Sequence, residues 1–370
     1  MRIGVNLVQY IDVQGIEIFA RDLLNAFKDI TDYELVFFVN EKSKNIFAMD
    51  GVTIVNVPLR NFSKTRRIFF QQFFLSQILR KNNVDILLCP SLAMPLWYKN
   101  KVVVLHDCAW KHFKEEAGVL SRIYLWLTTL SIKYRSLGSV AISNFSRIEF
   151  EKLFGIYTKT VIYEGPPHVL IASDSDMKAV EKKFDFLFNK QPYLFFIGNF
   201  HHRKNLVNAI RAFKKFLDTH PNYLFVCAGK RDGYEYNYIY KLSQQLCISD
   251  QVKFIGFVDE IEKSVLYKNA TALVFPSLYE GFGLPILEAQ SLGVPVLTSQ
   301  TSSLPEVAGD GAVFVDPVSP DSIYKGMKLI VSDYLLRENL VKKGYTNLQR
   351  FSWVKSAHIL NDFFHTLNSS

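Results

Sequence analysis

Cysteine is scarce in this sequence, and long apolar runs are absent. The 370 residues include four cysteines, none in a C-x-x-C pair, and no His or Cys cluster has the spacing of zinc ligands. We therefore expect buried, reduced thiols, as in a reducing cytosol, and neither a metal site nor a cofactor. No apolar run is long enough to span a bilayer. The start, MRIGVNLVQYIDVQG, predicts a strand and a loop rather than a signal peptide, so the expected location is cytoplasmic.

Acidic residues are missing from the stretch between Asp50 and Asp85. It contains RNFSKTRRIFFQQFFLSQILRKNN, residues 60–83, in which basic residues flank a run of phenylalanines. A basic, aromatic helix over 60–81 can lie on an anionic membrane surface, which would place the protein at the inner face of the cell membrane. Alternatively, the aromatic residues form the core face of a crossover helix. Both interpretations can hold, because successive phenylalanines cannot all face one core.

What the chain does contain is enough apolar residues for two cores. Hydrophobic residues make up 49% and aromatic residues 14% of the sequence, and 370 residues are too many for one ordinary core. The net charge of +8 favours anionic ligands or an anionic membrane surface. No RNA- or DNA-binding motif accompanies this charge, so we do not expect nucleic acid as a partner.

Strands and helical stretches alternate along the whole chain, as in βαβ units with parallel sheets. The predicted strands are, in order, 2–8, 35–39, 52–57, 84–89, 102–105, 139–143, 193–197, 223–228, 252–255, 272–275 and 294–298. The run Gly165-Pro166-Pro167 breaks regular structure and predicts the exit from the first domain. The predicted organisation is an N-terminal domain, a linker, a second domain and a final amphipathic helix, at 1–168, 169–190, 191–350 and 351–370.

One stretch, ALVFPSLYEGFGLPILEAQSL at 272–292, combines a strand, a glycine loop and a helix start. Gly281 and Gly283 have no Cβ, so the backbone there can approach a ligand closely. Proline suits a first helical turn, and the helix therefore begins at Leu284 or Pro285. Ligands bind at such strand ends in parallel sheets, and the first-turn amides attract anions.

Two carboxylates border this loop. Glu280 precedes the glycines, and Glu288 lies about one turn into the helix, where its Cβ leans back toward the loop. Carboxylates repel phosphate, so beside a phosphorylated ligand they would accept hydrogen bonds from hydroxyls, as a sugar supplies. The alternative is that Glu280 is a solvated loop residue and Glu288 caps the helix start.

A second anion site is predicted after the strand at 193–197. Gly198 ends that strand, and Arg203 and Lys204 stand at the start of the next helix, with Asn205 as its expected cap. Cations are mildly unfavourable at a helix N-terminus, which suggests a function. Arginine and lysine there would bind a diphosphate. The alternative is that both are ordinary surface charges.

Two further strand ends carry polar residues. His106 and Asp107 follow the strand at 102–105, where they could face a sugar or an acceptor. Alternatively, His106 is a satisfied interior histidine and Asp107 caps the next turn. In the run SSLPE, Ser303 and Glu306 have the spacing of a capping box, so Glu306 is interpreted as structural rather than catalytic.

The run FPSLYEGFGLPILEAQSLGVPVLTS resembles the signature of the retaining GT-B glycosyltransferases of family four. That family carries two glutamates separated by seven residues around a glycine loop, which Glu280 and Glu288 match. The two α/β halves, the basic loop and the His-Asp strand end are similar to the family as well. The resemblance implies the GT-B fold, with two Rossmann-like domains facing a central cleft and a C-terminal helix that crosses back to the first domain.

The resemblance also implies roles for individual residues. Lys204 would contact the donor's diphosphate together with Arg203, which replaces an arginine that many members carry where Asn199 stands here. The implied catalytic residues are His106, Arg203, Lys204 and Glu280. The implied donor-binding residues are Gly198, Arg203, Lys204, Val258, Glu280, Gly281, Phe282, Gly283, Leu284 and Glu288, with Gly15 and Asp107 on the acceptor side.

The implied activity is retaining, metal-independent hexosyl transfer from a nucleotide-diphosphate sugar. The donor would be a GDP- or UDP-sugar such as GDP-mannose, and the acceptor a glycan or lipid-linked glycan of a surface polysaccharide. Two alternatives stay open. A nucleotide-sugar epimerase of the same fold would convert donor without acceptor, whereas a non-catalytic nucleotide-sugar-binding protein would never release free nucleotide. A glycosidase would leave Arg203 and Lys204 unexplained.

Overall fold

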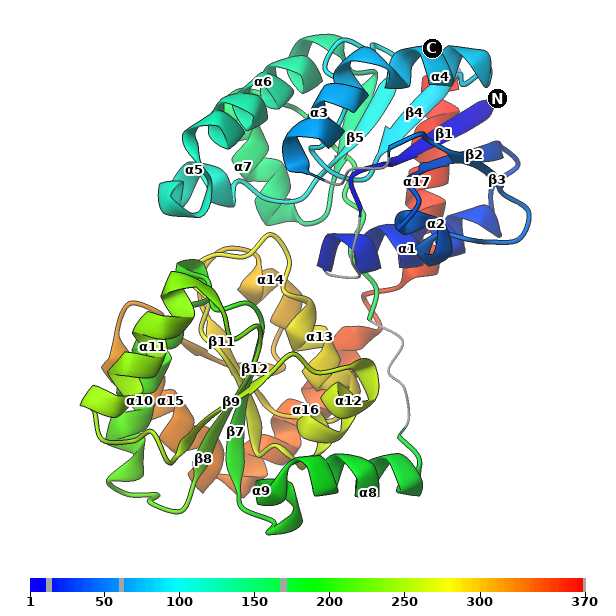
Figure 1. The fold of residues 1–370 in the computed structure, drawn as a ribbon. Coiled ribbons are helices and arrows are strands. Elements are labelled where there is room, and N and C mark those ends of the chain that lie inside the picture. The colour runs from blue at the N-terminus through cyan, green and yellow to red at the C-terminus, as the bar shows by residue number, and fades with distance from the viewer. Residues whose placement is uncertain (11–14, 60–62, 167–171, 369–370) are drawn as a thin grey trace. The chain divides into compact units, whose positions relative to one another are not determined.

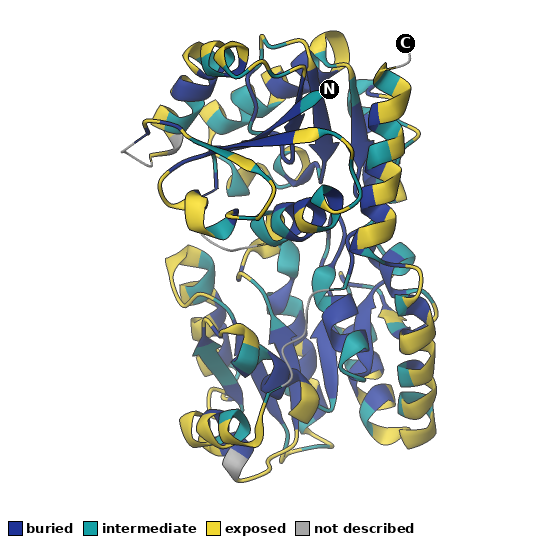
Figure 2. Cartoon of the chain, turned by 90° about the vertical axis from the view of Figure 1, so that its right-hand side faces the viewer, coloured by how far each residue is buried: buried dark blue, intermediate teal, exposed yellow. Residues whose placement is uncertain are grey.

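The structure is a computed structural model that describes residues 1–10, 15–59, 63–166 and 172–368. The chain forms two compact units, one of Met1–Gly165 with Phe351–Ser370 and one of Pro166–Arg350. Each unit is built on a parallel sheet of six strands with helices around it (Figure 1). The sheets are buried and the outer faces of the helices are exposed (Figure 2).

The sheet of the first unit has the strand order β3-β2-β1-β4-β5-β6. Its strands are β1 (Arg2–Leu7), β2 (Glu34–Val39), β3 (Thr53–Asn56), β4 (Ile86–Cys89), β5 (Lys101–Leu105) and β6 (Gly138–Ala141). β1, β2, β4 and β5 are nearly continuous runs of buried residues. Such runs are typical of parallel strands with helices on both faces of the sheet.

Helices of the first unit pack on its sheet in two groups. The helices are α1 (Gly15–Lys28), α2 (Ser43–Ile46), α3 (Lys64–Phe73), α4 (Leu75–Lys81), α5 (Ala109–His112), η1 (Lys114–Glu116), α6 (Val119–Arg135), α7 (Asn144–Phe154) and α17 (Trp353–Asn368). Side chains of α3, α4, α6 and α7 share one hydrophobic cluster with the strands. The last helix, α17, packs on α1, with the rings of Phe27 and Phe364 5.9 Å apart.

The second unit repeats the same topology, in the order β12-β11-β10-β7-β8-β9. Its strands are β7 (Tyr193–Ile197), β8 (Leu224–Ala228), β9 (Val252–Gly256), β10 (Ala272–Phe275), β11 (Val296–Ser299) and β12 (Ala312–Val315). Its helices are α8 (Asp174–Lys183), α9 (Asp185–Phe188), η2 (His202–Lys204), α10 (Leu206–Leu217), α11 (Gly233–Gln245), α12 (Glu260–Asn269), α13 (Leu284–Ser291), α14 (Leu304–Ala308), α15 (Pro320–Ser332) and α16 (Tyr334–Leu348). Chain order reverses between β7 and β10, which are neighbours in the sheet.

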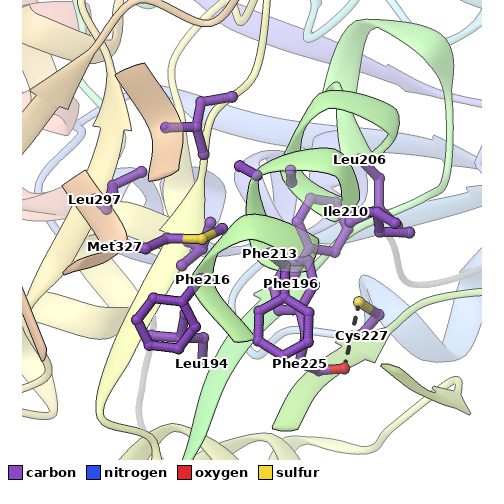
Figure 3. Close-up of a cluster of buried hydrophobic side chains, with 14 of the residues drawn as sticks. Leu194, Phe196, Leu206, Ile210, Phe213, Phe216, Phe225, Cys227, Leu297 and Met327 are labelled. Atoms are coloured by element: carbon purple, nitrogen blue, oxygen red, sulfur yellow. Dashed lines mark hydrogen bonds between the residues drawn. The ribbon is translucent and has the colours of Figure 1, made fainter. Parts of the chain in front are cut away.

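The core beneath these two strands is rich in aromatic rings. Phe196 of β7, Phe225 of β8 and Phe213 and Phe216 of α10 are fully buried together, and Figure 3 shows their rings gathered beside Cys227. Tight packing of large rings fixes the strands beneath the loops. Cys89, Cys108 and Cys227 are buried free thiols, as expected, whereas Cys247 is exposed.

Of the stretch predicted as a linker, 169–190, residues 169–171 lie outside the described part, and the rest holds structure of its own. Two helices, α8 and α9, occupy it, and Val180, Phe184 and Phe186 are buried. The ring of Phe186 meets the ring of Tyr193 edge-on at 5.6 Å. Since these residues pack within Pro166–Arg350, they belong to the second unit rather than to a connection. The helices were overlooked because their few apolar side chains lie in a mostly polar sequence.

Candidate active site

Glu280 lies at the end of β10, held between two cations that follow β7. The residue is buried, with 6% of its surface exposed. Arg203 Nη1 lies 2.8 Å from Oε2, and Lys204 Nζ lies 2.7 Å from Oε1. The interpretations of Glu280 as a solvated loop residue and of the two cations as ordinary surface charges are therefore wrong. β7 and β10 flank the point where chain order reverses, which is where open α/β sheets bind ligands.

These contacts keep Glu280 charged. Burial alone would raise the pKa of Glu280, but the charges of Lys204 and Arg203 lower the pKa below its ordinary value. The ammonium of Lys204 also lies over the ring of Phe275, 4.9 Å from its centroid. Two cations around one carboxylate leave a net positive charge, which attracts an anion to this edge of the sheet.

Glycines at the ends of β7 and β8 make room for the basic loop. Gly198 has a φ of +144°, which disfavours any residue with a side chain. A Cβ on Gly229 would lie 2.2 Å from the carbonyl oxygen of Gly198, so Gly229 is needed for the two backbones to approach. The Cε of Lys204 lies 3.7 Å from the position of a Cβ on Gly198. The lysine therefore lies along the glycine backbone.

Asn205 anchors the same loop, but not as the helix cap predicted from the sequence. It occupies the N-cap position of α10 with a φ of +61°, and its side chain makes no capping bond. Instead, its Nδ2 donates to the carbonyls of Pro276, at 2.8 Å, and Pro317, at 2.7 Å. The cap prediction was wrong because Nδ2 is aimed at the neighbouring strand ends, and Oδ1 accepts from the side chain of Asn208, at 2.9 Å, rather than from a backbone amide of α10. These bonds fix Arg203 and Lys204 relative to the end of β10.

The glycine loop after β10 is braced by two serines. α13 begins at Leu284, as predicted, and its N-cap Gly283 has a φ of +119°. Ser303 Oγ lies 2.9 Å from the carbonyl oxygen of Glu280 and 2.7 Å from that of Phe282, and these two acceptors share its one proton. Glu280 N donates to Ser302 Oγ at 3.1 Å.

The predicted capping box of Ser303 is therefore wrong, since its side chain does not cap α14. The hydroxyl is instead used by the glycine loop, whose carbonyls it reaches across the sheet edge. Two adjacent serines after β11, at the ligand edge of the sheet, were the available signal for this role. We did not assign Ser302 or Ser303 to the site.

Glu288 forms a second buried carboxylate cluster behind the loop. Its Oε1 lies 2.8 Å from Lys263 Nζ, and its Oε2 accepts a hydrogen bond of 2.9 Å from the Tyr267 hydroxyl. The interpretation of Glu288 as a cap of α13 is therefore wrong. Burial and then Glu288 raise the pKa of Tyr267 well above its ordinary value, so the phenol stays protonated and donates. Lys263 and Tyr267 were not predicted, because nothing in their spacing links α12 to α13.

The other predicted donor residues lie at the same edge of the second sheet. Gly198 follows β7, Val258 follows β9 and is buried, and Gly281 and Phe282 follow β10. Carboxyl ends of parallel strands share one edge, so the topology brings these residues to one side of the unit. No group of three His, Cys, Asp or Glu residues in the described ranges could hold a metal ion.

In the first unit, His106 and Asp107 follow β5. His106 is 8% exposed, its Nε2 lies 2.7 Å from the Pro90 carbonyl, and its ring meets Phe19 edge-on. Burial lowers the pKa of His106, so the ring is neutral at neutral pH. Asp107 Oδ1 accepts from the amide of Ala109 at 2.9 Å. A satisfied histidine and a turn-capping aspartate are both present, as the alternative interpretation held.

Gly15, predicted on the acceptor side, is the first residue of α1. The residues before it, 11–14, lie outside the described part of the chain. Its position after β1 is as the sequence predicted, and its role stays a prediction.

Residues 63–81 of the basic aromatic stretch 60–81 include α3 and α4, whereas 60–62 lie outside the described residues. Phe70, Leu75 and Leu79 are buried in the core, whereas Phe69 and Phe73 are exposed. The stretch is thus a crossover helix pair with a core face, and it also presents an aromatic face to solvent. None of the described helices is long and apolar enough to cross a bilayer.

Comparison with known proteins places these features in a family. Residues 178–347 match the model of the glycosyl transferases group 1. Over 277 residues the chain is 31% identical to O-antigen chain mannosyltransferase B of Escherichia coli, covering 71% of this chain and 70% of the relative. Among solved structures, sucrose-phosphate synthase from Thermosynechococcus elongatus has a TM-score of 0.79 at 18% identity, covering 100% of this chain and 99% of that one. HepE from Anabaena, solved with UDP-glucose, has a TM-score of 0.76 at 16% identity over 100% of both chains.

Proposed function

This chain belongs to the glycosyl transferases group 1 and has the GT-B fold, and on that premise we propose that it transfers a hexose from a nucleotide-diphosphate sugar to a glycan acceptor of a surface polysaccharide. Mannose is the proposed sugar, since the relative from Escherichia coli is named as an O-antigen chain mannosyltransferase. GDP-mannose is therefore the first donor to test, with UDP-sugars next. The acceptor is a growing glycan, free or lipid-linked.

The observation that carries the proposal is Glu280, with its two oxygens shared between Arg203 and Lys204 at the point where chain order reverses. A diphosphate requires cations, and a sugar requires hydrogen-bond acceptors for its hydroxyls. Each carboxylate oxygen has a second lone pair beyond its ion pair, so Glu280 can accept from a hydroxyl while it stays paired. The cluster combines both requirements in one place.

The proposed chemistry is front-face transfer with retention. The bond between the sugar's anomeric carbon and the diphosphate oxygen breaks, and a bond to the acceptor oxygen forms on the same face. The departing phosphate oxygen takes the acceptor's proton. Arg203, Lys204 and the first amides of α13 stabilise the charge on the leaving diphosphate, without a metal in this proposal. Glu280 holds sugar hydroxyls, and Glu288 holds the ribose of the nucleotide.

His106 is the contribution of the first unit to this proposal. Its low pKa leaves the ring neutral, so one nitrogen can accept while the other donates. A neutral ring contacts a sugar hydroxyl without attracting the diphosphate. Replacement of His106 by Phe keeps an aromatic ring but removes both nitrogens, and it should reduce turnover while nucleotide binding persists.

The test is turnover and nucleotide affinity in Glu280→Gln, with Glu235→Gln, a partly exposed glutamate of α11, as the matched control. We expect Glu280→Gln to lose most turnover, about 100-fold or more, while nucleoside diphosphate still binds. Wild-type turnover in Glu280→Gln would refute the proposed role. Conversion of the donor without acceptor would identify an epimerase, and binding without nucleotide release a non-catalytic protein.

A further inference from the structure

We propose that the outer face of α6, with Trp97 and the outer face of α3, is a docking surface for an anionic lipid bilayer. The proposal is independent of sugar transfer, because it rests on residues outside the site described above. We call this surface the α6 face, and it consists of Phe69, Phe73, Trp97, Val119, Leu120, Ile123, Trp126, Leu127 and Tyr134.

α6 is oriented with its apolar side outward. Leu120 is 83% exposed, and Ile123 and Trp126 are each 50% exposed. The side of the helix that faces the protein instead buries the hydroxyl residues Thr128 and Thr129, which bond to carbonyls of their own helix. A helix that faces water normally has the opposite arrangement. Exposed residues at positions 119, 120, 123, 126, 127 and 134 form one continuous stripe at helical spacing.

α3 and the loop before β5 extend this stripe into a broader face. Gln72 of α3 and Tyr124 of α6 both donate to the carbonyl of Met94, at 2.9 and 3.2 Å, so the two helices flank one loop. The rings of Phe69 and Phe73 lie tilted to each other on the outer side of α3, with their centroids 4.6 Å apart. Trp97, which is 67% exposed, lies in the same loop as Met94 and meets the guanidinium of Arg135.

Both helices pack on the same face of the first sheet. Phe70 of α3 and Ile132 of α6 belong to one hydrophobic cluster with the strands. The outer sides of α3 and α6 are therefore presented on the same side of the sheet. A single layer of helices with an apolar outer side suits a flat partner.

The charge around this face identifies the partner. Residues 51–148, which include α3 to α6, contain 14 lysines and arginines and 4 aspartates and glutamates, a net charge of +10, although the whole chain carries +8. The four acidic residues are Asp85, Asp107, Glu115 and Glu116, so α3, α4 and α6 contain none.

Basic residues border the apolar stripe, with Arg122, Lys133 and Arg135 on α6 and Arg66 and Arg80 beside α3. Cations around an apolar, tryptophan-containing face match a layer of anionic headgroups over acyl chains. A protein partner or a second copy of this chain would instead have to bring matching acidic residues. Exposed apolar residues of this extent normally mark a binding surface.

The test is co-sedimentation of the full chain with phosphatidylcholine vesicles, with and without phosphatidylglycerol, at low and high salt. We expect wild type to bind the anionic vesicles, and high salt to weaken that binding. Leu120→Asp with Ile123→Asp should lower the partition coefficient at least about tenfold. The control is Leu335→Asp, a leucine of α16 that is 75% exposed and should have no effect.

A second double substitution controls for misfolding of the first. Arg122→Gln with Lys133→Gln keeps the apolar face and should weaken binding to anionic vesicles alone, whereas Lys342→Gln with Lys343→Gln should not. Nucleotide-induced thermal shifts should be equal in all four variants, which separates this proposal from sugar transfer. Vesicle binding that is unchanged by both α6 variants would overturn it. So would self-association of wild type that Leu120→Asp with Ile123→Asp abolishes without any vesicle binding.

Discussion

Among single residues, Glu280 shows how neighbouring side chains compensate a buried charge. An isolated buried carboxylate is strongly disfavoured, and removal of one partner leaves an uncompensated charge. Here two cations share the carboxylate, and serine hydroxyls hold the loop that carries it. The cluster keeps Glu280 ionised inside the protein, at a cost in stability. Such an arrangement is typical of a site that binds a charged ligand.

The first prediction concerns Lys204→Ala. Loss of one partner of Glu280 should lower the free energy of unfolding of the second unit by about 1–3 kcal/mol at pH 7. Lys215→Ala is the control, because Lys215 pairs with Asp321 at the surface and its loss should change little. Urea unfolding measures both. Equal effects of the two substitutions would contradict the account.

The pH dependence of that difference follows from the pKa of Glu280, which lies below its ordinary value of 4.5. A depressed pKa in the folded state stabilises the protein fully above the ordinary value. That stability is lost as the pH falls through the folded value. The difference between wild type and Lys204→Ala should therefore be constant near neutral pH and shrink in acid below about pH 4.5.

A second prediction concerns Lys101, a fully buried lysine at the start of β5. Its ammonium donates to the carbonyls of Leu96 and Tyr98, and burial lowers its pKa from 10.5 to about 8. Between these two values the unfolded chain holds a proton that the folded chain has lost, so stability rises with pH. Relative to Lys101→Met, wild type should gain about 2–3 kcal/mol between pH 8 and 10. Lys99→Met, an exposed neighbour, should show no such trend.

Part of the site could be predicted from residue types alone. Arg203, Lys204, Glu280 and Glu288 stand beside glycines and strand ends, and such patterns indicate ligand chemistry. Lys263, Tyr267, Ser302 and Ser303 could not be predicted, because their contacts join segments that are distant in sequence. Asn205 and Ser303 were predicted as caps because local rules consider only the adjacent helix, whereas both side chains bond across the sheet edge.

At the scale of elements, close approach of the β7 and β8 ends determines where the basic loop lies. Gly198 N donates to the Ala228 carbonyl at 3.0 Å, and Gly229 N donates to the Gly256 carbonyl at 2.9 Å. Backbone hydrogen bonds thus join the end of β7 to that of β8, and the end of β8 to that of β9, at the ligand edge of the sheet. This junction supports η2, which holds Arg203 and Lys204.

The third prediction is that Gly229→Ala displaces this junction. Its φ permits alanine, but the new Cβ would meet the Gly198 carbonyl, which is backbone and cannot swing aside. We expect a loss of about 1–3 kcal/mol in the free energy of unfolding and weaker nucleoside diphosphate binding. Gly118→Ala is the matched control, since no atom lies within 4 Å of the Cβ that it would add. Unchanged affinity in Gly229→Ala would show that the loop does not depend on the junction.

Most strands could be predicted because parallel strands are short, continuous apolar runs. The predicted and observed bounds agree for β7 and β10 and differ by one or two residues for most others. α8 and α9 were overlooked because apolar periodicity is weak there, and the polar composition favoured a connection. The outward apolar side of α6 was also not recognised, since periodicity alone does not tell which side of a helix faces the core.

At the scale of the whole molecule, the chain closes on itself through α17. Phe351–Ser370 belongs to the first unit although it follows the second, and Phe364 is fully buried against α1. Thr31 Oγ1 donates to Asn361 Oδ1 at 2.9 Å, which also fixes the helix there. The sequence predicted this return through the family resemblance, since amphipathicity alone does not identify the partner of a terminal helix.

The fourth prediction is that Phe364→Ala destabilises the first unit selectively. A cavity of this kind costs about 3–5 kcal/mol. We expect the unfolding transition of the first unit to move to lower denaturant, while nucleotide binding by the second unit persists. Phe363→Ala, at the neighbouring position of α17, is the comparison. It removes a ring that lies against Gly138 rather than against α1. If nucleotide binding were lost as the first unit unfolds, the two units would not be separately stable.

In the proposed function, the second unit binds the diphosphate of a nucleotide through Arg203 and Lys204. The most direct test of this binding is thermal unfolding of wild type and Lys204→Ala with UDP, GDP, ADP or dTDP, each in the presence of a chelator. Ligand at about 100 times its dissociation constant adds roughly 2.7 kcal/mol of stability. We predict that one nucleotide raises the midpoint of wild type but not of Lys204→Ala. No shift of wild type with any nucleotide would contradict the account.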